Sequence, residues 1–323
     1  MKILVTGGAG YIGSCVVKYL VDQKHDVYVL DNLSTGHREA VDKSVPLLTA
    51  DYGDRADWII HDIKPEAVIH LAAVASVPDS FNKVEEYYEN NVVKMKQLLD
   101  ACGKYGVKYF IFSSSAAVYG NYSQHPYKET DGTYPINPYG NTKLIDELML
   151  KDYAQKYGIK YIIFRYFCAA GSDIDHFIGE QHEPETHVIP VMIHCWLQNK
   201  TFKIFGDNYP TADGTCIRDF VHIKDIASAH LLALDYLQDE NNSSEIFNLG
   251  GAITSIKSLV NTFNHSILIS SELPYEIVEP RHGDPGYLVA DIYKALNILH
   301  WEPVNSIIAV ILRDAFWWEK RKQ

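Results

Sequence analysis

A tyrosine and a lysine stand four residues apart in the segment NPYGNTK, at Tyr139 and Lys143. On a helix this spacing places both side chains on one face. An ammonium beside a phenol favours the phenolate and is expected to lower the phenol's pKa from about 10 toward the working pH. The pair predicts a proton-transfer site, although this spacing taken alone is a weak signal.

Three serines, Ser113 to Ser115, end the apolar segment KYFIFSSS, which predicts a strand at 108–115. The helix that carries the Tyr–Lys pair is expected next, at about 138–156. A serine hydroxyl at the end of that strand can bridge the phenol and a substrate oxygen. We therefore interpret one of these serines, together with Tyr139 and Lys143, as part of a proton-transfer site that lies beside a hydride acceptor.

The segments that must position these residues alternate between short apolar runs and longer helical patterns. Strands of continuous Val, Ile and Phe character, separated by helices, indicate a parallel sheet covered on both faces. We predict an α/β, doubly wound Rossmann fold whose ligands bind beyond the carboxyl ends of the strands. The expected strands cover 2–6, 26–31, 46–51, 66–73, 108–115 and 160–167, and long helices are expected at about 11–23, 84–104 and 138–156.

The glycine-rich segment TGGAGYIG follows the first predicted strand and opens the first helix, with Gly7, Gly8, Gly10 and Gly13. Glycines there permit a tight turn and let the backbone approach a pyrophosphate, which the helix N-terminus attracts. Asp31 follows Gly13 by 18 residues at the end of the second strand. A carboxylate at this place accepts a ribose 2′-hydroxyl and repels a 2′-phosphate, so NAD is the predicted cofactor. Arg38 is interpreted as a solvated loop residue.

The alternation weakens from about residue 170, where Gly, Pro and His become frequent. We predict a Rossmann domain at 1–170 and a smaller, loop-rich C-terminal substrate lobe at 171–323. The segment 218–240 again reads as a strand and a helix, and we expect it to return to the first domain.

Composition excludes several classes of protein. The net charge of −12 argues against sequence-independent binding to nucleic acid or to anionic membrane. The five cysteines are scattered without a CxxC pair, which is typical of a reducing compartment. Neither a signal peptide nor an apolar run long enough to span a bilayer is evident, so we expect a cytoplasmic protein. The segment HEPETH has a histidine spacing of five and a proline, Pro184, that breaks a helix, so we expect a loop beside the nucleotide and no metal site.

Taken together, these motifs resemble the extended short-chain dehydrogenase/reductase family, and within it the UDP-hexose 4-epimerases. The resemblance covers essentially the whole chain and rests on TGGAGYIG, LDNLSTG, HLAA, EYYENNV, FSSSAAVYG, PYGNTK, RYF, GEQHEPETHVIP, IFGDNYPTADGTCIRDFVHIKDIA, FNLG and RHGDP. The IFGDNYPT and RDFVH segments are the most specific to the epimerases. The resemblance implies NAD, a UDP-sugar substrate and a redox-neutral reaction through a 4-keto sugar, in galactose metabolism. It also implies a homodimer formed by the helices at about 84–104 and 140–156.

Carried over by position, the resemblance implies Ser115, Tyr139 and Lys143 as the catalytic residues and two sets of binding residues beside them. Asp51 and Tyr52 would bind the adenine, and Phe167 would lie against the nicotinamide. His187, Val188 and Lys203 to Phe205 would meet the uridine, and Arg218 and Arg281 would neutralise the diphosphate. The cofactor set is Gly7, Gly10, Tyr11, Ile12, Gly13, Asp31, Asn32, Leu33, Ser34, Thr35, Gly36, Asp51, Tyr52, Leu71, Ala72, Ala73, Ala75, Asn90, Ser113, Tyr139, Lys143 and Phe167. The substrate set is Ser115, Tyr139, Cys168, His187, Val188, Lys203, Ile204, Phe205, Arg218, Arg281, Asp284 and Leu288.

Three positions depart from the family pattern. Cys168 replaces an asparagine that helps to hold the substrate diphosphate, and we interpret it as a substituted binding residue, with a nucleophilic thiol as the alternative. Ala75 stands where some members have lysine. Leu288 takes the place where a tyrosine would exclude an N-acetyl group, which leads to the hypothesis that UDP-N-acetyl sugars are partly tolerated.

Other functions stay open at the level of the sequence. The same core serves 4-epimerases of UDP-N-acetylhexosamines, UDP-pentoses or UDP-uronates, although a uronate should recruit an extra cation near the sugar. A sugar-nucleotide dehydratase typically needs an added Asp-Glu pair after the serine strand, and SSSAAVYG has none. A non-catalytic nucleotide-sugar binder is disfavoured by the intact Ser115, Tyr139 and Lys143.

Overall fold

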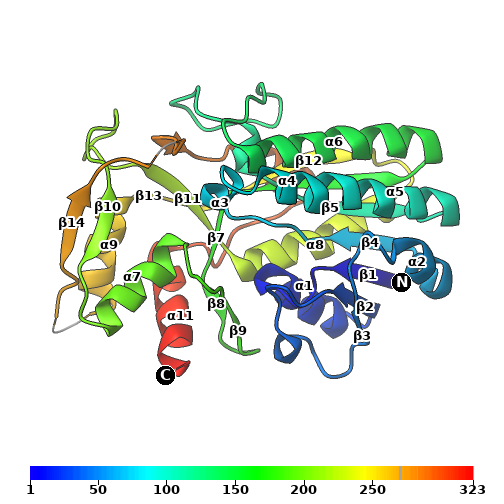
Figure 1. The fold of residues 1–323 in the computed structure, drawn as a ribbon, viewed down its shortest axis with the longest axis horizontal. Helices are drawn as coiled ribbons and strands as arrows, with labels where there is room; N and C mark the ends of the chain where they lie inside the picture. The colour runs from blue at the N-terminus through cyan, green and yellow to red at the C-terminus, as the bar shows by residue number, and fades with distance from the viewer. Residues whose placement is uncertain (269–270, 282, 323) are drawn as a thin grey trace.

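A parallel sheet with helices on both faces forms the larger part of the molecule (Figure 1). The computed structural model describes residues 1–268, 271–281 and 283–322. Among these residues, seven strands pair in the order β12-β6-β5-β4-β1-β2-β3, and all the pairs are parallel. Their bounds are β1 Lys2–Thr6, β2 Asp26–Asp31, β3 Leu47–Thr49, β4 Ala67–His70, β5 Tyr109–Ser115, β6 Lys160–Tyr166 and β12 Glu245–Leu249. The predicted doubly wound Rossmann fold is confirmed.

Two layers of helices bury the apolar faces of this sheet. On one face, α1 (Tyr11–Asp22) and α8 (Ile223–Gln238) pack against each other over the sheet. On the other face lie α2 (Ala56–Ile63), α5 (Lys94–Tyr105) and α6 (Pro138–Tyr157). The central strands are apolar without alternation because both of their faces are covered, as the completely buried β4 shows.

The strand order reverses at β1, because β2 and β3 lie on one side of it and β4, β5 and β6 on the other. A crevice at such a switch point is where doubly wound folds bind their ligands. The carboxyl ends of β1, β4 and β5 carry the glycine turn, Leu71 and Ser115. The sheet therefore brings the cofactor and catalytic motifs to one edge.

The helix predicted at 84–104 is not continuous. The structure divides this segment into α4 (Val84–Tyr87), a π-helical stretch η2 (Tyr88–Val93) and α5, after a short α3 (Val77–Ser80). π-Helical turns inside helices are frequent at functional sites, and this one holds the predicted cofactor residue Asn90.

The second lobe has its own sheets and its own apolar core. One sheet joins β7 (Cys168–Ala170), β11 (Ile217–His222), β13 (Ala252–Ser255) and β15 (Tyr287–Leu288), and β10 (Phe202–Phe205) pairs with β14 (Tyr275–Val278). The helices α7 (Val188–Leu197), α9 (Ile256–Ser266) and α11 (Ile308–Arg321) pack around this core. The remaining elements are η1 (Arg38–Ala40), η3 (Ala116–Val118), β8 (Ser172–Asp173), β9 (Ile178–Gly179) and α10 (Tyr293–Ile298).

The chain crosses between the lobes repeatedly. β6 continues almost directly into β7, and β12 is followed at once by β13. In both cases the first strand lies in the seven-stranded sheet and the second strand lies in the sheet of the second lobe. Of the expected return at 218–240, only the helix joins the first domain, where α8 packs on α1. The strand, β11, stays in the second lobe because it pairs with β7, β13 and β15. β12 adds a return that the sequence did not indicate. The division near residue 170 stays a prediction.

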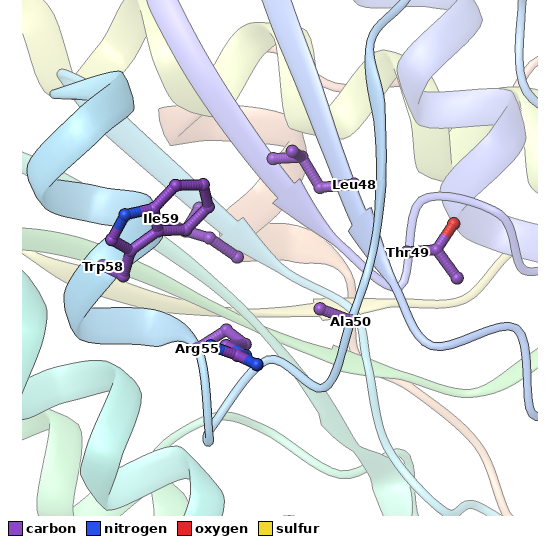
Figure 2. A pocket seen from close by; sticks show the side chains of 6 residues that line it. All are labelled: Leu48, Thr49, Ala50, Arg55, Trp58 and Ile59. Atoms are coloured by element: carbon purple, nitrogen blue, oxygen red, sulfur yellow. The ribbon is translucent and has the colours of Figure 1, made fainter.

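A shallow cavity of about 250 Å³ lies at the edge of the first domain, where β3 and α2 meet (Figure 2). It is lined by Leu48, Thr49, Ala50, Arg55, Trp58 and Ile59, and none of these is a predicted site residue. No helix in the described ranges is long and apolar enough to cross a membrane.

Candidate active site

The glycine turn after β1 fits a dinucleotide pyrophosphate. Gly7 has a φ of +74°, and a Cβ there would lie 2.5 Å from the Ala72 nitrogen. A Cβ on Gly13 would lie 2.1 Å from the Gly7 oxygen, so helix and turn pack too closely for any side chain. A Cβ on Gly10, by contrast, would meet only the Gly7 oxygen, at 3.4 Å, so the backbone there is open to an approaching ligand. No acidic side chain lies in the first turn of α1, which leaves the positive helix end available to phosphate.

Asp31 lies at the end of β2 and orients the turn on which the adenosine ribose is predicted to bind. One carboxylate oxygen accepts the Ala9 N–H at 3.0 Å and the other accepts the Leu33 N–H at 2.8 Å. These bonds fix the carboxylate beside the glycine turn. The Arg38 guanidinium donates to the Thr49 hydroxyl at 2.8 Å. Arg38 is exposed, as expected, but it begins the short η1 and does not lie in a loop.

The predicted adenine residues are joined by a lysine that the motifs did not single out. Lys94 lies 2.7 Å from an Asp51 carboxylate oxygen and donates to the Asn90 side chain at 2.7 Å. Burial would raise the pKa of Asp51, but the Lys94 hydrogen bond holds it below its usual range. The Tyr52 hydroxyl donates to the Asn90 carbonyl. The structure therefore brings Asp51, Tyr52 and Asn90 into one group.

Asn91, next to Asn90 in the EYYENNV segment, is a second residue that sequence reasoning missed. Its buried side-chain amide accepts the Val74 N–H at 3.0 Å and donates to the Val74 carbonyl at 3.1 Å, and these two bonds hold the loop after β4. It also donates to the Thr142 hydroxyl at 3.0 Å on α6. The predicted cofactor residues Leu71, Ala72 and Ala73 lie on this loop, so Asn91 links their position to the catalytic helix.

The catalytic helix α6 begins where the proline predicts. Pro138 is its first residue, and the Asn137 side chain caps the helix by accepting the Gly140 N–H at 2.8 Å. This start turns Tyr139 and Lys143 toward the end of β5. The Lys143 ammonium donates to the Ser113 carbonyl at 2.9 Å and lies 6.0 Å from the centre of the Tyr139 ring. Both side chains are buried.

The pKa of the phenol is shifted in the direction opposite to our prediction. Burial raises the pKa of Tyr139 to about 12, although its hydrogen bond with Ser115 opposes this. Burial also lowers the pKa of Lys143 to about 8, while the charges of Asp146 and Glu147 oppose that shift. The prediction failed because it counted the ammonium but not the loss of water around the phenol.

A buried ion pair between Glu147 and Arg165 connects α6 to the sheet. Glu147 is completely buried and binds the Arg165 guanidinium through both oxygens, at 2.9 and 2.7 Å. The Ser114 hydroxyl donates to Glu147 at 2.5 Å, and Arg165 donates to the Tyr119 hydroxyl at 2.9 Å. This network connects α6 to β5 and β6, and the helical spacing of Lys143 and Glu147 was the signal available in the sequence.

Phe167 and Leu288 lie in one apolar cluster with Tyr119 at the entry to the second lobe. Leu288 pairs in register with Arg218 between β15 and β11, which places it between the nicotinamide and diphosphate residues of the prediction. Burial raises the pKa of the Cys168 thiol to about 12, and a protonated thiol is a poor nucleophile. The raised pKa thus favours the binding interpretation of the half-buried Cys168 over the nucleophilic one.

The cationic residues of the predicted diphosphate site lie together. Arg218 is buried and contacts the Asp284 carboxylate at 2.5 Å. The Arg281 guanidinium lies 3.9 Å from the centre of the Phe205 ring. Tyr209, which no motif assigned to a role, lies near these charges, and no described residue hydrogen-bonds its buried hydroxyl.

The residues predicted to meet uridine differ in how far their side chains are exposed. Lys203 is exposed on β10, but the Ile204 side chain is buried in the core of the second lobe. Ile204 can therefore meet a ligand through its backbone alone. His187 is the residue before α7, and Val188 is its first residue, so both stand at a helix N-terminus.

Comparison with known proteins shows the family of this chain. A family model described as the NAD dependent epimerase/dehydratase family matches residues 3–250. The chain belongs to this family. A UDP-glucose 4-epimerase of Lactobacillus helveticus is 43% identical to it over an alignment of 323 positions, which covers 99% of this chain and 97% of the relative.

Solved epimerase structures are also similar over nearly the whole length. The UDP-glucose 4-epimerase of Brucella ovis in complex with NAD has a TM-score of 0.91 at 42% identity and covers 98% of this chain and 97% of its own. The UDP-Glc/GlcNAc 4-epimerase of Campylobacter jejuni has a TM-score of 0.85 at 38% identity, with 99% of each chain covered. The predicted family, the isomerase class and NAD dependence are confirmed at the level of the family, and the roles of individual residues stay predictions.

Proposed function

We propose that this protein interconverts UDP-glucose and UDP-galactose at C4, with NAD as a bound cofactor and a 4-keto sugar as intermediate. The observation that carries the proposal is the buried Tyr139–Lys143 pair at the end of β5, beside a glycine turn suited to NAD. Full-length similarity to UDP-glucose 4-epimerases supports the same reaction.

In the proposed mechanism, Tyr139 as phenolate takes the proton of the sugar 4-hydroxyl, with Ser115 between phenol and substrate oxygen. NAD, when bound, accepts the C4 hydride and returns it to the opposite face after the keto sugar has turned. Tyr139 then gives its proton back to the new 4-hydroxyl, so acid–base state and redox state are both restored. Lys143, one turn along α6 from Tyr139, supplies positive charge that favours the phenolate.

The second lobe would hold the UDP group during this turn. Arg218 and Arg281 supply the positive charge that a diphosphate requires. Asp284 would bond a ribose hydroxyl once Arg218 binds phosphate. Holding the nucleotide at these residues leaves the sugar free to rotate, which the reaction needs.

The direct test is to incubate the purified protein with a panel of UDP-sugars and follow C4 epimers by NMR. Conversion of UDP-glucose to UDP-galactose without added NAD, together with NAD released from the protein by heat, is the expected result. A protein that contains NAD but converts no UDP-sugar would contradict the proposal.

A second substrate class is favoured by Leu288, which lies in the cluster with Phe167. Leucine leaves more room than tyrosine beside the sugar 2-substituent, and one similar structure is described as a UDP-Glc/GlcNAc 4-epimerase. We therefore include UDP-N-acetylhexosamines as poorer substrates. UDP-GlcNAc that stays unconverted would exclude this class.

The wider setting is also part of the proposal. We propose a cytoplasmic homodimer in galactose metabolism, with α5 and α6 at the contact between subunits. Leu148 on α6 is half exposed, which supports an apolar contact there. Light scattering of the purified protein measures its mass directly, and a monomer at all concentrations would exclude the dimer.

A further inference from the structure

Two glutamates and two histidines converge on one point in the loop between β9 and α7. They are Glu180, His182, Glu185 and His187, and their donor atoms all lie within 4.8 Å of one another. His187 Nδ1 lies 2.5 Å from Glu180 Oε1, and His182 Nδ1 lies 3.2 Å from the same oxygen. The Glu185 carboxylate lies 3.4 Å from His187 and 3.7 Å from His182.

Two of these donor atoms have no hydrogen bond of regular geometry with any described residue. Within the described part of the chain, Glu180 Oε1 and His182 Nδ1 are buried and have no hydrogen-bond partner, in spite of their short distances. In tetrahedral zinc sites with bonds of about 2.0–2.1 Å, neighbouring donors are ~3.3 Å apart. The four contacts given above, at 2.5 to 3.7 Å, span this distance.

We propose that these four side chains bind one Zn²⁺ ion. Two imidazole nitrogens and two carboxylate oxygens are a donor set that zinc accepts, and the two carboxylates balance its charge. Protein groups fill all four positions, which is the arrangement of structural rather than catalytic zinc. Our expectation that HEPETH is not a metal motif assumed a helix, whereas a loop brings the same residues together without helical spacing.

The zinc ion would fix the loop that joins the cofactor turn to the substrate lobe. The His182 ring lies edge-on to Tyr11, with ring centres 6.5 Å apart, and His37 contacts the Gln181 carbonyl at 3.1 Å. The Glu180 carbonyl accepts the Trp318 N–H at 2.7 Å from α11. β9 itself lies beside α1 and α11 (Figure 1). One ion would thus hold together three segments and the start of α7.

The competing state is a quartet of ions without metal, in which both imidazoles are protonated. The short contact with the Glu180 carboxylate raises the pKa of His182 to about 9, and the Glu180 charge raises the pKa of His187 to about 10 against the effect of burial. Zinc would have to displace these two protons. The two states therefore differ in metal content and not in overall charge.

The test is to exchange the full-length protein into zinc-free buffer, add ZnCl₂, remove the excess by gel filtration and measure retained zinc by mass spectrometry. The wild-type protein should retain one equivalent. His182→Ala and Glu185→Gln should weaken zinc binding more than ~100-fold, beyond the loss that changes around the ligands usually cause. Glu185→Gln keeps the shape of the side chain and an oxygen for the Thr186 and His187 N–H groups, so folding should be maintained.

His176→Ala is the matched control. Its side chain is 31% exposed against 32% for His182, it is paired with Asp173, and its ring also lies edge-on to a tyrosine of α1. This variant should retain one equivalent of zinc, and Co²⁺ in place of Zn²⁺ should give a tetrahedral absorption band in it and in the wild type. Wild-type protein that retains no zinc would overturn the proposal and leave the ion quartet, and equal zinc loss in His176→Ala would overturn the assignment of ligands. Neither result depends on epimerase activity.

Discussion

Replacing Tyr139 by phenylalanine separates the proton chemistry of the site from its packing. The ring of Tyr139 is 9% exposed and lies edge-on to Tyr87, with ring centres 6.4 Å apart, and phenylalanine keeps these contacts. The change removes one hydroxyl, whose hydrogen bond is worth about 1 kcal/mol of stability. General acid–base catalysis contributes about 10²–10⁴-fold, so Tyr139→Phe should fold, retain NAD and lose at least ~10²-fold in kcat.

The pKa of Tyr139 also determines the free energy needed to form its phenolate. With a pKa of about 12, only ~10⁻⁴ of Tyr139 is phenolate at pH 8, which corresponds to ~5 kcal/mol. Bound NAD and substrate have to supply most of this difference, because Lys143 contacts the Ser113 carbonyl instead of the phenol. Phenolate absorbance in the NAD-loaded protein, with the Tyr139→Phe spectrum subtracted, should titrate well below pH 12.

Tyr87→Phe is the control for both measurements. Tyr87 is buried, burial raises its pKa to about 12, and its hydroxyl donates to the Ser76 carbonyl, which is not one of the predicted catalytic groups. It should keep kcat within a few-fold. Our reasoning fails if Tyr139→Phe retains activity within tenfold of wild type, or if both variants lose the same amount.

Three further predictions concern the cofactor, the support of the helix and the substrate. Asp31→Asn should weaken NAD retention about tenfold to a hundredfold, because hydrogen bonds to a charged group contribute about 1.5–3 kcal/mol, and heat-released NAD measures this. Glu147→Gln should leave Arg165 buried without its counter-charge, at a cost of about 3–5 kcal/mol. Its melting temperature should fall by roughly 5 °C, whereas exposed Asp152→Asn on the same helix should show no shift. Leu288→Tyr should abolish conversion of UDP-GlcNAc and spare conversion of UDP-glucose. NMR would measure both products, and equal loss of the two activities would contradict the assigned role of Leu288.

The parts of the fold that follow local patterns could be predicted from the sequence. The apolar runs gave the strands of the first domain because buried parallel strands need no alternation, and the helix start at Pro138 follows from proline's fixed φ. The break of the 84–104 helix could not be predicted, since the bonds that Asn91 makes there, to Val74 and Thr142, join residues distant in the chain.

Electrostatic effects of burial were harder to foresee at the site. The sequence shows that Lys143 can approach Tyr139, but the net pKa depends on water excluded by residues far away in the chain. Lys94 and Glu147 were overlooked for the same reason, because their partners, Asp51 and Arg165, are brought to them by tertiary structure. The convergence of Glu180 and His187 depends on a loop path that no periodicity describes.

The late position of β12 in the chain has a consequence for synthesis of the protein. This strand covers the outer side of β6, yet it lies at Glu245–Leu249, about 80 residues further along. At about 5–20 residues per second, the ribosome needs several seconds to supply it after β6 has emerged. During that time the apolar β6 presents an unpaired edge, which is a template for aggregation. A nascent chain that stops before β12 should therefore depend on chaperones, even though all three proposed catalytic residues have already been made.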